Sequence, residues 1–136
     1  MDTFESSIKT VPFPQERVYA KLADLNNLEG VKDKIPAEKI KELSFDTDHI
    51  TFKMDPVGSI TLRIVDREPC KTIKFEADKS PVASNLWVQI VPLNENECKI
   101  KLTIKAELNV FIRGMVKGHI QKGLEKIAEV LAVLPY

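Results

Sequence analysis

Apolar and polar residues alternate along the stretch from Cys98 to Leu108 and, less strictly, along several shorter runs elsewhere. A side-chain period of two is typical of a β-strand with one buried face. Turn-forming residues separate the alternating runs, so we expect a meander of about seven antiparallel strands with one wet face and one covered face. The predicted strands span residues 3–11, 38–45, 49–55, 59–67, 71–77, 84–93 and 98–108.

The period changes after Asn109. From there to Pro135 no proline interrupts the chain, and apolar residues recur at helical spacing. We therefore predict a helix over about residues 110–134 that covers the apolar face of the sheet. The residues expected on its covered stripe are Ile112, Met115, Val116, His119, Ile120, Leu124, Ile127, Ala128 and Leu131. Two shorter helices are also expected. The first covers 15–23, after Pro12-Phe13-Pro14, and the second follows an interruption at 24–27 and runs to about residue 34.

Three glycines, Gly114, Gly118 and Gly123, lie inside the predicted long helix. Each costs about 1 kcal/mol of helix stability relative to alanine. Such glycines either permit a close backbone approach, a bend or a ligand, or they are tolerated weak points. The sequence leaves both interpretations open.

Strand register decides which side chains face inward. Tight turns predict that Phe52 faces Leu62 and that Leu62 faces Phe75. The strand at 84–93 is apolar on both faces, so its orientation depends on the turn at 94–97. A two-residue hairpin would turn Trp87 and Gln89 inward, where Gln89 would need a hydrogen-bond partner such as a ligand. A loop one residue different would instead turn inward Leu86, Val88 and Ile90.

Length and charge narrow the class of protein. A chain of 136 residues fits one domain, which we place at 1–136. Lysine plus arginine equals aspartate plus glutamate at 20 each, so the balance argues against nucleic acid as a partner and against an anionic membrane. No apolar run approaches the ~18 residues that span a bilayer, and no signal peptide is visible, so we expect no membrane insertion and a cytoplasmic location.

Few residues offer chemistry. Cys70 and Cys98 are far apart and share no pattern with histidines, so we expect reduced thiols, no metal site and no cofactor. No Gly-rich phosphate loop is present. His119 is the one polar residue on the predicted covered stripe of the helix. It either hydrogen-bonds a ligand or moves a proton, or it is a partly buried histidine satisfied by a carbonyl.

The order of elements resembles the helix-grip fold of the superfamily that includes START lipid-transfer domains, birch-pollen-allergen-like proteins and polyketide cyclases, also called SRPBCC. The resemblance covers the whole chain. It includes the run from Val11 to Tyr19 at the entry to the first helix, the junction Leu108-Asn109, and the Gly-Leu-Glu-Lys-Ile stretch at 123–127. The resemblance implies an α+β fold in which a curved antiparallel sheet wraps around the C-terminal helix.

It also implies a cavity between sheet and helix. In that fold the residues expected to bind a ligand are Phe52, Met54, Leu62, Phe75, Trp87, Gln89, Ile104, Met115 and His119. Aromatic and methionine side chains suit flat or flexible apolar ligands. The same side chains could instead fill the space completely.

Three hypotheses of function follow. The first is the binding of a small hydrophobic or lipid-like molecule, which the resemblance implies. The second is an enzyme of the cyclase or hydratase type that uses His119 as acid or base and Gln89 to orient the substrate; the few inward polar residues count against it. The third is an assembly or interaction protein with a filled core, in which an outward Trp87 forms a homodimer surface.

Overall fold

The computed structural model describes residues 2–27, 40–54, 58–79, 83–108 and 110–133, without the side chains of 40–43, 54, 79, 112, 115 and 116. These described residues form an eight-stranded antiparallel sheet and two α-helices. The strands are β1 (Asp2–Glu5), β2 (Lys9–Val11), β3 (Ile40–Phe45), β4 (His49–Met54), β5 (Gly58–Glu68), β6 (Thr72–Lys79), β7 (Ser84–Pro92) and β8 (Cys98–Ala106). The helices are α1 (Gln15–Leu22) and α2 (Val110–Val133).

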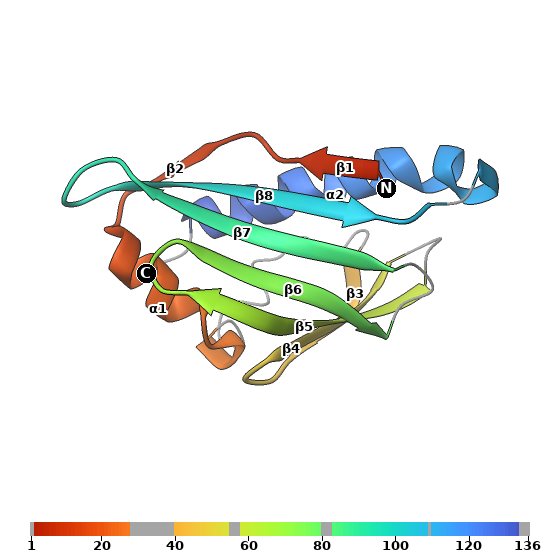
Figure 1. The fold of residues 1–136 in the computed structure, drawn as a ribbon, viewed down its shortest axis with the longest axis horizontal. Helices are drawn as coiled ribbons and strands as arrows, with labels where there is room; N and C mark the ends of the chain where they lie inside the picture. Colours follow the sequence, from red (N-terminus) through yellow and green to blue (C-terminus); the bar gives the residue numbers. More distant parts are fainter. Residues whose placement is uncertain (1, 28–39, 55–57, 80–82, 109, 134–136) are drawn as a thin grey trace.

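The sheet follows the chain as a meander from β3 to β8, and the N-terminal strands then close its other side. Its order is β1-β8-β7-β6-β5-β4-β3, and β2 also pairs with β8. Figure 1 shows α2 running along one side of this sheet, behind β8 in that view, while α1 lies beside the ends of the central strands. The predicted α+β helix-grip architecture is therefore confirmed.

Strands β4 to β8 and both helices begin and end within two residues of the predicted bounds. The predicted strand at 3–11 is instead broken into β1 and β2. At the break, the Ser6 hydroxyl accepts a hydrogen bond from the Leu102 amide at 2.9 Å and donates one to the Ser7 carbonyl. A side chain thus takes the place of one ladder bond, which interrupts the strand. The predicted interruption at 24–27 contains a 3₁₀ turn at 25–27, and the second predicted helix, which follows it up to residue 34, lies outside the described residues.

The predicted register of β4, β5 and β6 is wrong by two residues. Phe52 pairs with Ile60 and Ile50 with Leu62, while Leu62 pairs with Ala77 and Ile64 with Phe75. Between β4 and β5 the closing pair is Met54 with Gly58, whereas the predicted register pairs residue 55 with residue 59. Between β5 and β6 the closing pair is Glu68 with Thr72, and two irregularities interrupt the ladder. Because side chains alternate with a period of two, a shift of two leaves the same residues on the inner face.

The hairpin between β7 and β8 decides the orientation of β7. Pro92 pairs with Cys98, so five residues, 93–97, form the loop. The Asn94 side chain holds this loop, because it accepts a hydrogen bond from the Asn96 amide and donates one to Glu97. The structure therefore has the second of the two alternatives and not the two-residue hairpin. Trp87 pairs with Thr103 rather than with Ile104, and the inner face carries Leu86, Val88 and Ile90.

Helix α2 is fixed to the sheet mainly along β1, β2 and β8. Leu124 and Ala128 are buried in the core, at 1% and 0% exposure. Polar contacts anchor the same edge: Gln121 donates to the Glu5 carbonyl at 2.9 Å, and the Glu125 carboxylate accepts hydrogen bonds from Ser7. Arg113 pairs with Asp2 nearer the start of the helix. The helix therefore leans toward one side of the sheet.

Two of the three helix glycines face open space. A Cβ atom added at Gly114 or Gly118 would meet nothing within 4 Å, and both residues are exposed. We therefore expect Gly114→Ala and Gly118→Ala each to raise the free energy of unfolding by about 0.5–1 kcal/mol, measured by urea denaturation. Gly58→Ala is the matched control with the opposite sign, because Gly58 has a φ of +103°. A destabilised Gly114→Ala would show instead that the glycine is needed for packing.

Candidate functional site

A cavity of about 160 Å³ lies between the inner face of the sheet and α2. Its walls are almost entirely apolar. The residues that line it are Leu22, Leu25, Ile50, Phe52, Ile60, Leu62, Ile73, Phe75, Ser84, Asn85, Leu86, Val88, Leu102, Ile104, Ala106, Leu108, Ile120, Gly123, Leu124, Ile127 and Leu131. The lean of α2 toward β1, β2 and β8 is consistent with open space over β4, β5 and β6.

Alternation along five strands builds the sheet side of the cavity. Every second residue of β4 to β8 faces inward, so each strand contributes two or more apolar side chains. Cross-strand pairing sets these side chains in rows, for example Phe75, Leu86 and Ile104. Most of these side chains are branched or aromatic. Such rigid shapes hold a cavity open better than flexible ones.

The helices supply the opposite wall. Ile120, Leu124, Ile127 and Leu131 recur at helical spacing along α2, and Gly123 adds a position without a side chain. Leu22 ends α1 and Leu25 follows it; both are buried, at 4% and 2% exposure. The end of α1 therefore covers one part of the cavity.

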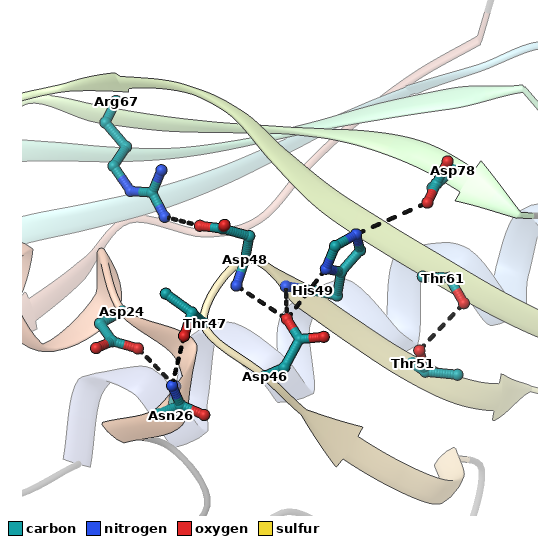
Figure 2. A network of polar contacts seen from close by, with 10 residues as sticks. All are labelled: Asp24, Asn26, Asp46, Thr47, Asp48, His49, Thr51, Thr61, Arg67 and Asp78. Atoms are coloured by element: carbon teal, nitrogen blue, oxygen red, sulfur yellow. Dashed lines mark hydrogen bonds and ion pairs between the residues drawn. The ribbon is translucent and has the colours of Figure 1, made fainter.

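A polar network holds the end of α1 against the turn between β3 and β4 (Figure 2). The side-chain amide of Asn26 donates a hydrogen bond to the Thr47 hydroxyl at 2.7 Å, and the backbone amide of Leu25 donates one to the Thr47 carbonyl at 3.3 Å. Arg67 extends the network, because it pairs with Asp48 and donates to the Ala23 carbonyl. These contacts place Leu22 and Leu25 over the cavity.

His49 and its acidic neighbours belong to the same network and lie on its solvent side. Nδ1 of His49 is 3.0 Å from Asp46, and Nε2 is 3.8 Å from Asp78. Desolvation would raise the pKa of Asp46, but hydrogen bonds from the Asp48 and His49 amides and from the His49 ring hold that pKa below its ordinary value. The group does not line the cavity. Its evident role is to shape the β3–β4 turn.

No residue with a titratable side chain lines the cavity in the described part of the chain. Two polar residues do, Ser84 and Asn85, both at the start of β7. General acid–base catalysis needs a titratable group within hydrogen-bond reach of the reacting atoms. The described walls can therefore exclude water and bind apolar surface, but they supply no side chain that could act as a general acid or base.

The predicted site residues divide into three groups. Phe52, Leu62, Phe75 and Ile104 line the cavity. Met54 and Met115 have side chains outside the described part of the structure. The structure does not place Trp87, Gln89 and His119 on the cavity wall.

Trp87 and Gln89 point to the outer face of the sheet because of the five-residue hairpin loop. Lys74 and Lys105 lie over the indole of Trp87, at 5.5 and 5.8 Å from the ring centre, a cation–π arrangement. Gln89 accepts a hydrogen bond from Thr103 at 3.2 Å. Both side chains thus make contacts on the face away from the cavity. Of the two orientations that the sequence left open, the structure has the one that turns Leu86, Val88 and Ile90 inward.

His119 does not line the cavity either. Consecutive helix residues point about 100° apart. Since Ile120, Leu124, Ile127 and Leu131 line the cavity, His119 falls beside that stripe and is partly exposed. The spacing of apolar residues in the sequence placed His119 and Ile120 on the same broad stripe. In the structure, the contacts of α2 with β1 and β2 fix the rotation of the helix, so that Ile120 faces the cavity and His119 does not.

Several lining residues escaped the sequence-based list. Ile50, Ile60 and Ile73 have the same alternation as the residues that were named, so the pattern could have identified them. Leu22 and Leu25 could not be found from periodicity, because their position depends on how α1 packs. Ser84 gave no signal, since a serine at the start of a strand is ordinary.

Both cysteines are free. Cys98 is fully buried, and burial, followed by the nearby Glu16 carboxylate, raises the pKa of its thiol. Cys70 is partly exposed in the turn before β6, with a φ of +62°. Within the described residues no group of three or more His, Cys, Asp or Glu side chains could hold a metal ion.

No described helix is long and apolar enough to cross a membrane. A long C-terminal helix laid across a curved antiparallel sheet, with a cavity between them, defines the helix-grip class of folds. The sequence matches no protein-family model and no curated protein. Solved structures do share its fold.

One similar structure is a truncated norcoclaurine synthase from Thalictrum flavum, with a TM-score of 0.74 and 14% identity over 99% of this chain and 94% of that chain. Another is a START superfamily protein from Mycobacterium smegmatis, with a TM-score of 0.59 and 13% identity over 95% and 98% of the two chains. A protein from Thermus thermophilus has a TM-score of 0.67 and 17% identity over 96% and 94%. These likenesses establish the fold.

Proposed function

We propose that this protein binds a small, uncharged, hydrophobic molecule in the cavity between the sheet and α2. The observation that carries the proposal is an apolar cavity of about 160 Å³ that the packed core leaves open. Well-packed interiors contain few voids larger than a water molecule, so a void of this size is a feature to explain. Apolar walls favour the binding of a hydrophobic ligand, because binding removes the apolar surface of the ligand from water.

The size of the cavity sets the size of the ligand. An apolar cavity of about 150 Å³ in another protein stays dry and accepts benzene. We therefore expect a ligand of about one six-membered ring. A structure with the same fold, a norcoclaurine synthase from Thalictrum flavum, was solved in complex with two molecules that each contain one such ring, dopamine and hydroxybenzaldehyde.

The other two hypotheses have less support. A cyclase or hydratase needs positioned acid and base groups, and the described cavity wall offers neither His119 nor another titratable residue. An assembly protein with a filled core is disfavoured by the cavity itself. Trp87, its predicted contact residue, is already covered by the two lysines of the outer face.

Titration of the purified protein with toluene and with benzoate tests the proposal. Both contain one ring, but benzoate carries a charge that the walls cannot pair, so its burial is costly. We expect toluene to bind with a measurable dissociation constant and benzoate to bind at least about 100-fold more weakly, by NMR titration. Equal binding of the two, or no binding of toluene, would contradict the proposal.

A further inference from the structure

Among the described residues, Ser84 is the polar residue whose side chain faces the cavity. It begins β7 and pairs with Ala106 of β8. It shares the inner face of the strand with Leu86 and Val88, which also line the cavity. Asn85 lies against the cavity too, but strand alternation turns its side chain toward the outer face.

The hydroxyl of Ser84 forms no hydrogen bond with any residue that the structure describes, although its neighbours are apolar and it is only partly exposed. A serine hydroxyl can donate one hydrogen bond and accept two. The Ser84 oxygen is not among the fully buried side-chain atoms that lack a partner, so solvent reaches it while the cavity holds no ligand. A ligand that fills the cavity would exclude that solvent and would have to supply a hydrogen-bond partner in its place.

We propose that the bound molecule carries one uncharged hydroxyl or carbonyl group and that Ser84 binds this group at the β7–β8 end of the cavity. The inference rests on the proposed function and adds the chemical class and the orientation of the ligand. The polar end lies at Ser84 and Ala106. The apolar remainder lies against Leu86, Val88 and Leu124. Ser84 acts by hydrogen bonding alone.

Phenol and toluene are suitable probes, because a hydroxyl in one replaces a methyl of similar size in the other. Their dissociation constants are measured by NMR titration for the wild-type protein, for Ser84→Ala and for Ser59→Ala. Ser59 is an exposed serine on β5, so Ser59→Ala makes the same chemical change on the outer face. In Ser84→Ala we expect the ratio of the phenol constant to the toluene constant to rise about 3- to 10-fold.

Ser59→Ala should leave the ratio at its wild-type value, and Ser84→Thr, which keeps the hydroxyl, should preserve most of the phenol preference. Retained toluene binding by Ser84→Ala shows that the variant is folded. An unchanged ratio in Ser84→Ala, with both probes binding, overturns the role of Ser84 and leaves the proposed function standing. Failure of both probes to bind the wild-type protein overturns the proposed function as well.

Discussion

Ala106→Phe is expected to abolish the binding of single-ring ligands while the protein stays folded. Ala106 is 2% exposed, and its methyl group faces the cavity from β8. The new phenyl ring is about as large as the benzene that a cavity of this size accepts, so the phenylalanine side chain would itself fill the cavity. We expect toluene affinity to fall at least about 10-fold, which corresponds to about 1.4 kcal/mol, in the same NMR titration.

The control is Ala20→Phe, which adds the same ring at an exposed position of α1. It should bind toluene as the wild-type protein does. Circular dichroism and urea denaturation verify the fold of Ala106→Phe, since an overpacked core costs about 1–3 kcal/mol. Undiminished toluene binding by a folded Ala106→Phe would place the ligand site elsewhere.

Leu102→Ala is expected to destabilise the protein by about 2–5 kcal/mol, the range for large-to-small changes in a core. Leu102 lies in β8, which pairs with β7 on one side and with β1 and β2 on the other, and its side chain is 0% exposed. Its loss would enlarge a cavity that already exists, and the paired strands on both sides limit any collapse. Urea denaturation measures the free energy of unfolding.

Val91→Ala is the matched control in the neighbouring strand. Val91 is 57% exposed, so its truncation should change the free energy of unfolding by less than about 0.5 kcal/mol. If Leu102→Ala lowered the free energy of unfolding by less than about 1 kcal/mol, the Leu102 side chain would not be part of a tightly packed core. Since unfolding removes the cavity, a saturating ligand should also raise the stability of the wild-type protein.

The fold that this chain shares with other proteins does not determine the chemistry of its cavity. A helix-grip structure can host catalysis or simple binding, because the scaffold sets the position of the cavity and the lining side chains set its chemistry. In this chain the described lining is apolar apart from Ser84 and Asn85. That composition is why we infer binding rather than a reaction, despite the likeness in fold to norcoclaurine synthase.

Local patterns were sufficient to predict most of the elements. The alternation from Cys98 onward predicted β8, and the change to helical spacing after Asn109 predicted α2. These predictions succeed because a strand or a helix with one buried face must repeat apolar residues at its own period. Phe52, Leu62, Phe75 and Ile104 were assigned to the inner face for the same reason, and they lie there.

The orientation of β7 was beyond the reach of periodicity. The strand is apolar on both faces, so one residue more or less in the 93–97 loop exchanges Trp87 for Leu86 at the cavity. The hydrogen bonds of Asn94 settled that loop length. Similarly, the rotation of α2, fixed by Gln121 and Glu125 against the N-terminal strands, moved His119 off the cavity wall.

The sequence by itself thus determined the elements, their order and the inner face of most strands, because each follows from the spacing of apolar residues along the chain. Only the tertiary structure decided that the core leaves a cavity, that Ser84 faces it with no hydrogen-bond partner among the described residues, and that Trp87, Gln89 and His119 do not line it. Those features depend on contacts between segments far apart in sequence, where a single residue of register or a small rotation of a helix changes what the cavity contains.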